Sequence, residues 1–128
     1  MNPGLLSFYS VCANLLGMKD GTIQDSQITA SSEMNEKHPA VNARLDRPRI
    51  GGKAAAWLPA TDDLTQWIQV EFAAYTYVSG IILQGRADAQ AEWVTRYKIE
   101  YSNDGVIWLY VKDDNYDDIV SSESSNLL

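Results

Sequence analysis

The sequence has little of the chemistry on which most enzymes and metal sites depend. It has one cysteine, Cys12, and one histidine, His38, in 128 residues. A single cysteine cannot form a disulfide within the chain and does not fix the redox compartment. A zinc site would need further His or Cys ligands. Nothing beside Cys12 favours activation of its thiol by His38, and Gly51-Gly52 lacks the spacing of a phosphate-binding loop. We therefore expect that the protein is not an enzyme.

Basic residues are also scarce, with 10 Lys and Arg against 17 Asp and Glu, for a net charge of −7. This charge argues against nucleic acid as a partner, because phosphate contacts need a basic face. It also opposes electrostatic capture by an anionic membrane. No apolar run has the length of a membrane-spanning helix, and residues 1–13 lack the basic segment that opens a signal peptide.

Carboxylate oxygens are the only potential metal ligands that the sequence contains in large number. Calcium could bind at Asp62-Asp63 or at an acidic cluster near the C-terminus, which comprises Asp113, Asp114, Asp117 and Asp118. Acidic pairs in loops are usually just solvated. We therefore expect no cofactor, with calcium as the alternative.

Strand patterns dominate the chain. Apolar and polar residues alternate in residues 67–72 and 97–101, and residues 77–83 and 106–111 are apolar or β-branched runs. Asn103-Asp104-Gly105 separates two of these runs and predicts a hairpin turn. A helical stripe of Leu5, Phe8, Cys12, Leu15 and Leu16 is possible, although nearby Pro and Gly disfavour it. The pattern predicts an all-β sandwich or barrel.

Three segments are expected: a lead-in segment at residues 1–11, a domain at residues 12–112, and an acidic, serine-rich tail at residues 113–128, most of which we predict to be disordered. Within the domain, a series of short motifs resembles the discoidin domains, also called coagulation factor 5/8 type C domains. The motifs are Leu16-Gly17-Met18, Asp20-Gly21-Thr22-Ile23, the stretch from Asp25 to Ser32, Ala43-Arg44-Leu45, Ala56-Trp57-x-Pro59, the stretch from Gln66 to Phe72, Gln84-Gly85-Arg86, Trp93-Val94-x-x-Tyr97, and Tyr101-Ser102-Asn103-Asp104-Gly105-x-x-Trp108.

The resemblance implies a distorted jelly-roll antiparallel β-sandwich, like that of galactose-binding domains, with binding loops at one end. It also implies an extracellular or cell-surface module for adhesion or recognition. Members of the family bind galactose-type sugars, phosphatidylserine membranes, collagen, or the basic C-terminus of a growth factor. We therefore expect a glycan or an extracellular matrix or cell-surface protein as the partner. A phosphatidylserine membrane is the alternative, and a structural fragment with no binding of its own is a third possibility.

The resemblance places the projecting loops at Glu33–Ala40, Leu58–Gln66 and Arg86–Glu92. They hold six acidic residues against two basic ones, and Met34 and Leu64 are the only apolar wedges, so a membrane ligand is disfavoured. The predicted ligand-binding residues are Met34, Asn35, His38, Asp62, Asp63, Arg86 and Glu92.

Some of these residues are predicted because they match ligand-binding positions in members of the family. Asp62 lies where receptors for a basic peptide have an aspartate, and Arg86 and Glu92 match positions of collagen receptors. The aromatic residues that these receptors have in the first loop are replaced by Met34 and His38, whereas polar groups suited to sugars are present. We expect the four tryptophans to be core or loop anchors, and Arg44 to be structural and paired with a carboxylate. His38 is either simply exposed or a pH-sensitive donor to the ligand.

In the family, the cysteine at the position of Cys12 bonds to a second cysteine at the end of the domain, which this sequence does not contain. The resemblance therefore leads us to expect a truncated domain that lacks the last strands. Open strand edges and a free Cys12 thiol would then favour self-association and low stability.

Overall fold

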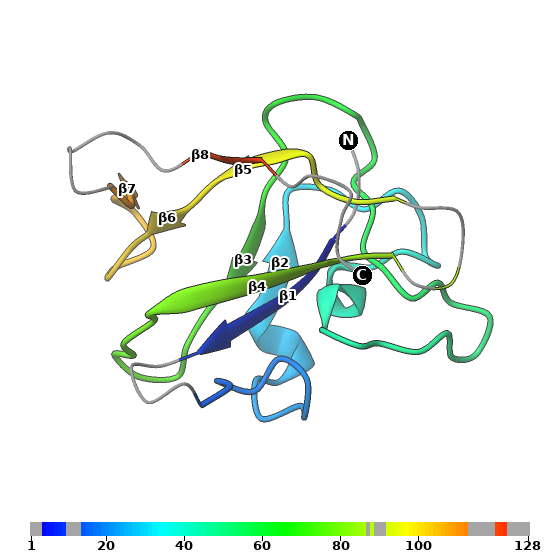
Figure 1. Cartoon of the computed structure of the whole chain (residues 1–128), viewed down its shortest axis with the longest axis horizontal. Coiled ribbons are helices and arrows are strands. Elements are labelled where there is room, and N and C mark those ends of the chain that lie inside the picture. Colours follow the sequence, from blue (N-terminus) through cyan, green and yellow to red (C-terminus); the bar gives the residue numbers. More distant parts are fainter. Residues whose placement is uncertain (1–3, 10–13, 87, 89–91, 113–119, 123–128) are drawn as a thin grey trace. The chain divides into compact units, whose positions relative to one another are not determined.

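The computed structural model describes residues 4–9, 14–86, 88, 92–112 and 120–122 (Figure 1). These residues form eight β-strands and two short 3₁₀ helices, and no helix among them is long and apolar enough to cross a membrane. The chain divides into two compact units, Met1–Trp93 and Val94–Leu128, which are described separately below.

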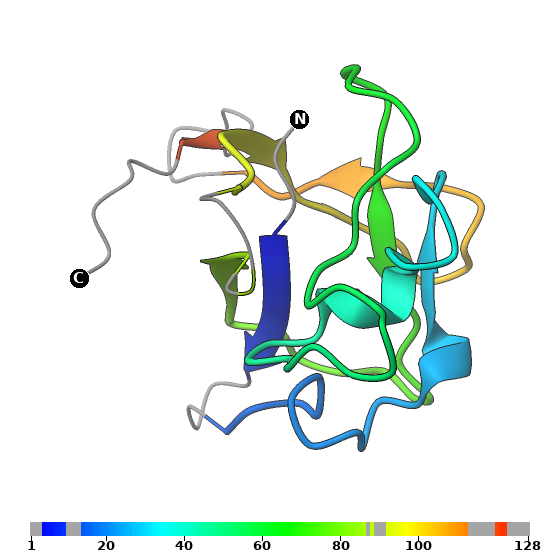
Figure 2. The same cartoon turned by 90° about the vertical axis from the view of Figure 1, so that its right-hand side faces the viewer.

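The first unit contains two antiparallel strand pairs. Strand β1 (Gly4–Tyr9) pairs with β4 (Gly80–Gly85), and β2 (Ile28–Ala30) pairs with β3 (Ile68–Val70). The two short helices are η1 (Asp25–Gln27) and η2 (Ala40–Ala43). Figure 1 shows one strand pair in front of the other, and the turned view of Figure 2 separates them, with η2 between. The first unit is therefore built as two layers.

The core of this unit lies between the layers. Its buried members are Met18, Ile23, Ile28, Ala40, Ala43 and Trp57. The register pairs Ile28 with Val70 and Ala30 with Ile68, and all four residues pack in or against the core. Strand β4 alternates in the same way, since Ile81 and Leu83 pack against the core while Ile82 is exposed. Alternation of this kind is what a half-buried strand requires. The predicted all-β class is confirmed.

Arg44 fastens the turn before β2 to the end of η2. Its side chain is buried and donates to the carbonyl oxygens of Met18 (3.0 Å) and Ile23 (2.7 Å). It also forms an ion pair with Asp25, at 2.6 Å between Nη2 and Oδ1. The structural role predicted for Arg44, with a carboxylate as its partner, is confirmed.

The second unit contains strands β5 (Arg96–Lys98), β6 (Glu100–Tyr101), β7 (Leu109–Tyr110) and β8 (Val120–Ser122). Strands β6 and β7 form an antiparallel hairpin, and β5 pairs with β8. In the hairpin loop, Gly105 has a φ of +72°, and Asp104 Oδ1 accepts hydrogen bonds from the backbone N–H groups of Val106 and Ile107. The turn predicted at residues 103–105 is therefore confirmed.

The structure differs from the sequence-based expectations at several places. Gly4–Tyr9 is a strand, so the apolar residues near the N-terminus do not form the helical stripe considered above. The strand predicted at residues 77–83 begins at Gly80, and Tyr77 and Val78 are exposed before it. Val120–Ser122, in the tail predicted to be disordered, pairs with β5. Cys12 and the aspartates at 113, 114, 117 and 118 lie outside the described residues.

Candidate ligand-binding loops

The first and second loops are joined at their bases by a network of polar side chains. Gln66 Oε1 accepts hydrogen bonds from the hydroxyl groups of Ser31 (2.8 Å) and Ser32 (2.5 Å). Ser32 Oγ also accepts from the backbone N–H of Ala60 in the second loop, at 2.9 Å. The indole N–H of buried Trp57 donates to the carbonyl of Ser32 at 2.9 Å. The two loops therefore start from one fixed base, and Trp57 has the anchoring role expected of it.

The other tryptophans differ. Trp67 and Trp108 are 49% and 40% exposed, and Trp93 is only half-buried. Burial as in a core therefore applies to Trp57 alone among the four.

Within the second loop, Asp63 is the organising residue. Its carboxylate accepts hydrogen bonds from the hydroxyl groups of Thr61 (2.7 Å) and Thr65 (2.6 Å), from the Thr65 N–H, and from the Gln66 amide. The hydrogen bonds from Thr65, followed by those from Gln66 and Thr61, hold the pKa of Asp63 well below its usual range. Asp63, predicted to bind ligand, is engaged in shaping its own loop. Its neighbours Asp62 and Leu64 are exposed at the surface.

The third loop is closed by ion pairs around Arg86. The guanidinium donates to Asp88 at 2.6 Å and to Glu92 at 2.9 Å, and the Arg86 N–H donates to the Glu92 carbonyl. The hydrogen bond to Asp88 is the main cause of a raised pKa at Arg86 and of a lowered pKa at Asp88. The Arg86 side chain is only 15% exposed. Arg86 and Glu92, both predicted to bind ligand, instead form an ion pair with each other.

Gly85 explains how the third loop can close so tightly. A Cβ at this position would lie 3.2 Å from the Glu92 carbonyl oxygen, closer than most side chains approach backbone. Asp88 also accepts a hydrogen bond from the Ala55 N–H at 3.1 Å. The third loop is therefore attached to the segment that precedes Trp57, and through it to the base of the other loops.

The first loop contains the only histidine. Asn35 Oδ1 accepts from the Lys37 N–H at 2.9 Å and lies 2.9 Å from His38 Nδ1. His38 Nε2 is buried and has no hydrogen-bond partner among the described residues. Burial is the main cause of a lowered pKa at His38, and the positive charge of Arg86 is the next. His38 is therefore not simply exposed, whereas Met34 is 54% exposed.

Sequence reasoning identified the loops but missed what braces them. Ser31, Ser32, Gln66 and Asp88 were not predicted as site residues, although each ties one loop to a neighbouring segment. The signal was present, since the two serines and the glutamine lie within the motifs quoted above. Figure 1 shows the loops between β2 and η2 and before β3 along the upper and right-hand parts of the first unit.

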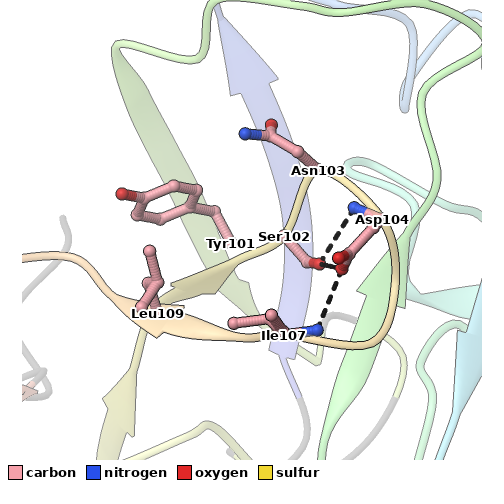
Figure 3. A pocket seen from close by; sticks show the side chains of 6 residues that line it. All are labelled: Tyr101, Ser102, Asn103, Asp104, Ile107 and Leu109. Carbon is pink, nitrogen blue, oxygen red and sulfur yellow. Dashed lines mark hydrogen bonds between the residues drawn. The ribbon is translucent and has the colours of Figure 1, made fainter.

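A hollow in the second unit is a weaker candidate for a ligand site than the three loops. It has a volume of about 140 Å³ and is lined by Tyr101, Ser102, Asn103, Asp104, Ile107 and Leu109 (Figure 3). Ser102 Oγ accepts a hydrogen bond from the Asp104 N–H, and Asp104 Oδ1 accepts one from the Ile107 N–H; these bonds, drawn as dashed lines in Figure 3, hold the hairpin turn. Among the described residues, no group of three or more His, Cys, Asp and Glu could hold a metal ion.

A two-layer β-structure that carries three braced loops has the architecture of a binding module. The family model for the F5/8 type C domain matches residues 27–126. The chain therefore belongs to the F5/8 type C, or discoidin, domain family, which confirms the resemblance and its β-sandwich fold.

Curated relatives agree with this assignment. The chain is 43% identical over 113 residues to mouse EGF-like repeat and discoidin I-like domain-containing protein 3, a match that covers 82% of the chain and 23% of the relative. It is 38% identical over 112 residues to lactadherin of Sus scrofa, with coverage of 81% and 26%. It is 34% identical over 107 residues to human neuropilin-1, with coverage of 81% and 11%. The chain thus spans about a quarter or less of the length of these relatives. No solved structure matches significantly.

Proposed function

We propose that this chain is an extracellular recognition module for adhesion, without catalytic activity, which binds a glycan or a matrix protein through its three loops. The observation that carries this proposal is that some loop side chains hold the loops in place while others are exposed at the loop surface. Gln66, Asp63 and Arg86 hold the loops in place, while the apolar side chains of Met34 and Leu64 are exposed. A rigid scaffold with exposed loop side chains loses little conformational entropy when a ligand binds.

The chemistry of the exposed side chains favours a hydroxyl-rich or basic ligand. Asp62 and Glu36 present carboxylates, which accept hydrogen bonds from sugar hydroxyls or from basic side chains. Met34 and Leu64 add apolar surface, which the carbon face of a sugar ring or an apolar matrix side chain could cover. Polar groups that fix orientation beside a small apolar surface are typical of small-ligand sites.

A phosphatidylserine membrane is the second candidate, because Leu64 is 102% exposed and Met34 is 54% exposed. Burial of two such side chains contributes about 3–6 kcal/mol, comparable to a single acyl chain, which anchors proteins only marginally. The six acidic residues of the loops would repel an anionic surface. A glycan or matrix ligand therefore ranks first.

Parallel assays on one protein sample test the proposal. Binding is measured on a glycan array, on immobilised collagen, and by co-sedimentation with phosphatidylserine vesicles. Asp62→Asn should weaken glycan or collagen binding by about tenfold, the effect of one charge-assisted hydrogen bond. The matched control is Glu71→Gln, because exposed Glu71 follows β3 whereas the second loop precedes it. This control should bind as the unmodified protein does.

The apolar side chains have their own control. Leu64→Ala is compared with Leu15→Ala, since Leu15 is also exposed, at 45%, but lies outside the loops. Salt-sensitive binding to phosphatidylserine vesicles that only Leu64→Ala abolishes, with no signal for glycan or collagen, would reverse the ranking.

A further inference from the structure

The imidazole of His38 is held in one protonation state by its surroundings. A carbonyl oxygen can only accept hydrogen bonds, and Asn35 Oδ1 already accepts from the Lys37 N–H. The 2.9 Å contact with Nδ1 therefore requires Nδ1 to carry the proton. Nε2 is then a bare acceptor, and it is buried without a partner among the residues that the structure describes. The neutral ring tolerates this position, at the cost of one unmade hydrogen bond.

Protonation would place a charged donor at that buried position. The charged groups that act on His38 are Arg86, Asp88 and Glu92 of the third loop, and Lys37 of its own loop. Both carboxylates are already engaged by the Arg86 guanidinium. Charging His38 therefore adds a third cation to Arg86 and Lys37, and no described residue offers an acceptor at Nε2 to offset its desolvation.

We propose that protonation of His38 expels its imidazole from this buried position and rearranges the Glu33–Pro39 loop, so that the ligand-binding end responds to mild acid. Exposure of the ring breaks the contact between Nδ1 and Asn35 Oδ1, which holds the turn from Asn35 to His38 together with the hydrogen bond from the His38 N–H to the Asn35 carbonyl. The consequence for ligand binding rests on the proposed function, whereas the opening of the loop does not.

The sign of the pH dependence follows from the same contacts. Burial, with Arg86 as the next cause, lowers the pKa of His38 from its ordinary value of 6.5. Well above 6.5 the ring is neutral in both folded and unfolded chains, and it contributes no pH dependence. As the pH falls below 6.5, the unfolded chain takes up the proton first, so the closed loop loses stability. Exposure of the ring restores its ordinary pKa, and this linkage drives the opening.

The test is an NMR titration of the full chain from about pH 8 to pH 4.5, across the range in which histidine changes charge. The chain has one histidine, so the imidazole nitrogen signals need no assignment. The Nδ1–H tautomer should be seen at high pH. The midpoint should lie below 6.5. The Ala40 N–H donates to Glu33 Oε1 within the same loop. The protection of the His38 and Ala40 amides, relative to the intrinsic exchange rate at each pH, should therefore fall with that same midpoint.

Two variants separate His38 from other acid effects. His38→Gln, which cannot titrate, should abolish the change in the protection of the Ala40 amide, relative to intrinsic exchange, between about pH 7 and pH 5. Glu36→Gln removes an exposed carboxylate of the same loop and should leave that change intact. A midpoint at or above 6.5, or loop amides that become more protected in acid, would show that His38 binds Asp88 or Glu92 when charged, and would overturn the proposal.

The titration uses no ligand, so its result is independent of whether the loops bind glycan or matrix. Once a ligand is known from the array, the dissociation constant should rise by about tenfold between pH 7 and pH 5 in the unmodified chain and stay level in His38→Gln, if opening removes one well-placed contact. A loop that opens with no change in affinity would refute the link between His38 and binding, and would leave the proposed function standing.

Discussion

Removal of Arg44 should destabilise the first unit, and the loss of unfolding free energy can be worked out from its contacts. The guanidinium serves three acceptors: the carbonyls of Met18 and Ile23, and the carboxylate of Asp25. Asp25 is 69% exposed and can be rehydrated, so its share is small. The two carbonyls would be left inside the turn, at about 1–3 kcal/mol each. With the lost charge-assisted bonding, we expect Arg44→Ala to cost about 3–5 kcal/mol of unfolding free energy.

The measurement is urea unfolding followed by tryptophan fluorescence, because Trp57 belongs to the same core as Met18 and Ile23. Arg49→Ala is the matched control, since Arg49 is exposed and should change stability by less than about 0.5 kcal/mol. Arg44→Lys keeps the charge but not the fork of donors, and should recover less than half of the loss. A cost below about 1 kcal/mol for Arg44→Ala would show that water replaces the guanidinium, and would refute the reasoning.

Two further predictions concern backbone conformation and acid stability. Gly17→Ala should cost at least about 2 kcal/mol of unfolding free energy, because Gly17 has a φ of +111° and the added Cβ would lie 2.6 Å from Thr22 Cβ. Gly21→Ala, at a φ of +84° with open space around it, should cost about 1 kcal/mol. Equal losses of stability in thermal unfolding of the two variants would disprove the steric argument. Asp63 has a lowered pKa in the folded chain, so its contribution is present above its ordinary value of 3.8 and is lost as the pH falls; Asp63→Asn should flatten the acid side of a melting-temperature profile, and an unchanged profile would contradict this.

The strands that depend on a local pattern could be predicted from the sequence. Alternation placed a strand at residues 67–72, of which Ile68–Val70 forms β3, and Asp104-Gly105 marked the β6–β7 hairpin. Local pattern failed at Gly4–Tyr9, because a short apolar run fits a strand or a helix equally well. Its pairing with β4, more than 70 residues further along the chain, decides the outcome. Such a pairing depends on tertiary context that periodicity does not contain.

The candidate site also has features that could be predicted from the sequence and features that could not. The family motifs predicted the three loops and placed Arg86 and Glu92 in the third, but they did not predict that the two side chains form an ion pair. The link from Ser32 to Gln66 spans 34 residues, and nothing in the pattern of either segment indicates the other. The state of His38 could not be predicted either, because it depends on which side of the ring faces Asn35 and which is buried.

The residues that reveal the family are largely the ones that brace the loops. Ser32, Trp57, Gln66 and Arg86 all lie in the motifs by which the chain resembles discoidin domains, and each holds a loop through hydrogen bonds or ion pairs. The side chains exposed at the loop surface, such as that of Leu64, lie between those motifs. A side chain that braces a loop must contact fixed partners at fixed distances, whereas an exposed loop side chain is constrained only by the ligand that it binds. Family membership therefore specifies the scaffold, and the ligand of this chain has to be inferred from the side chains that the scaffold leaves exposed.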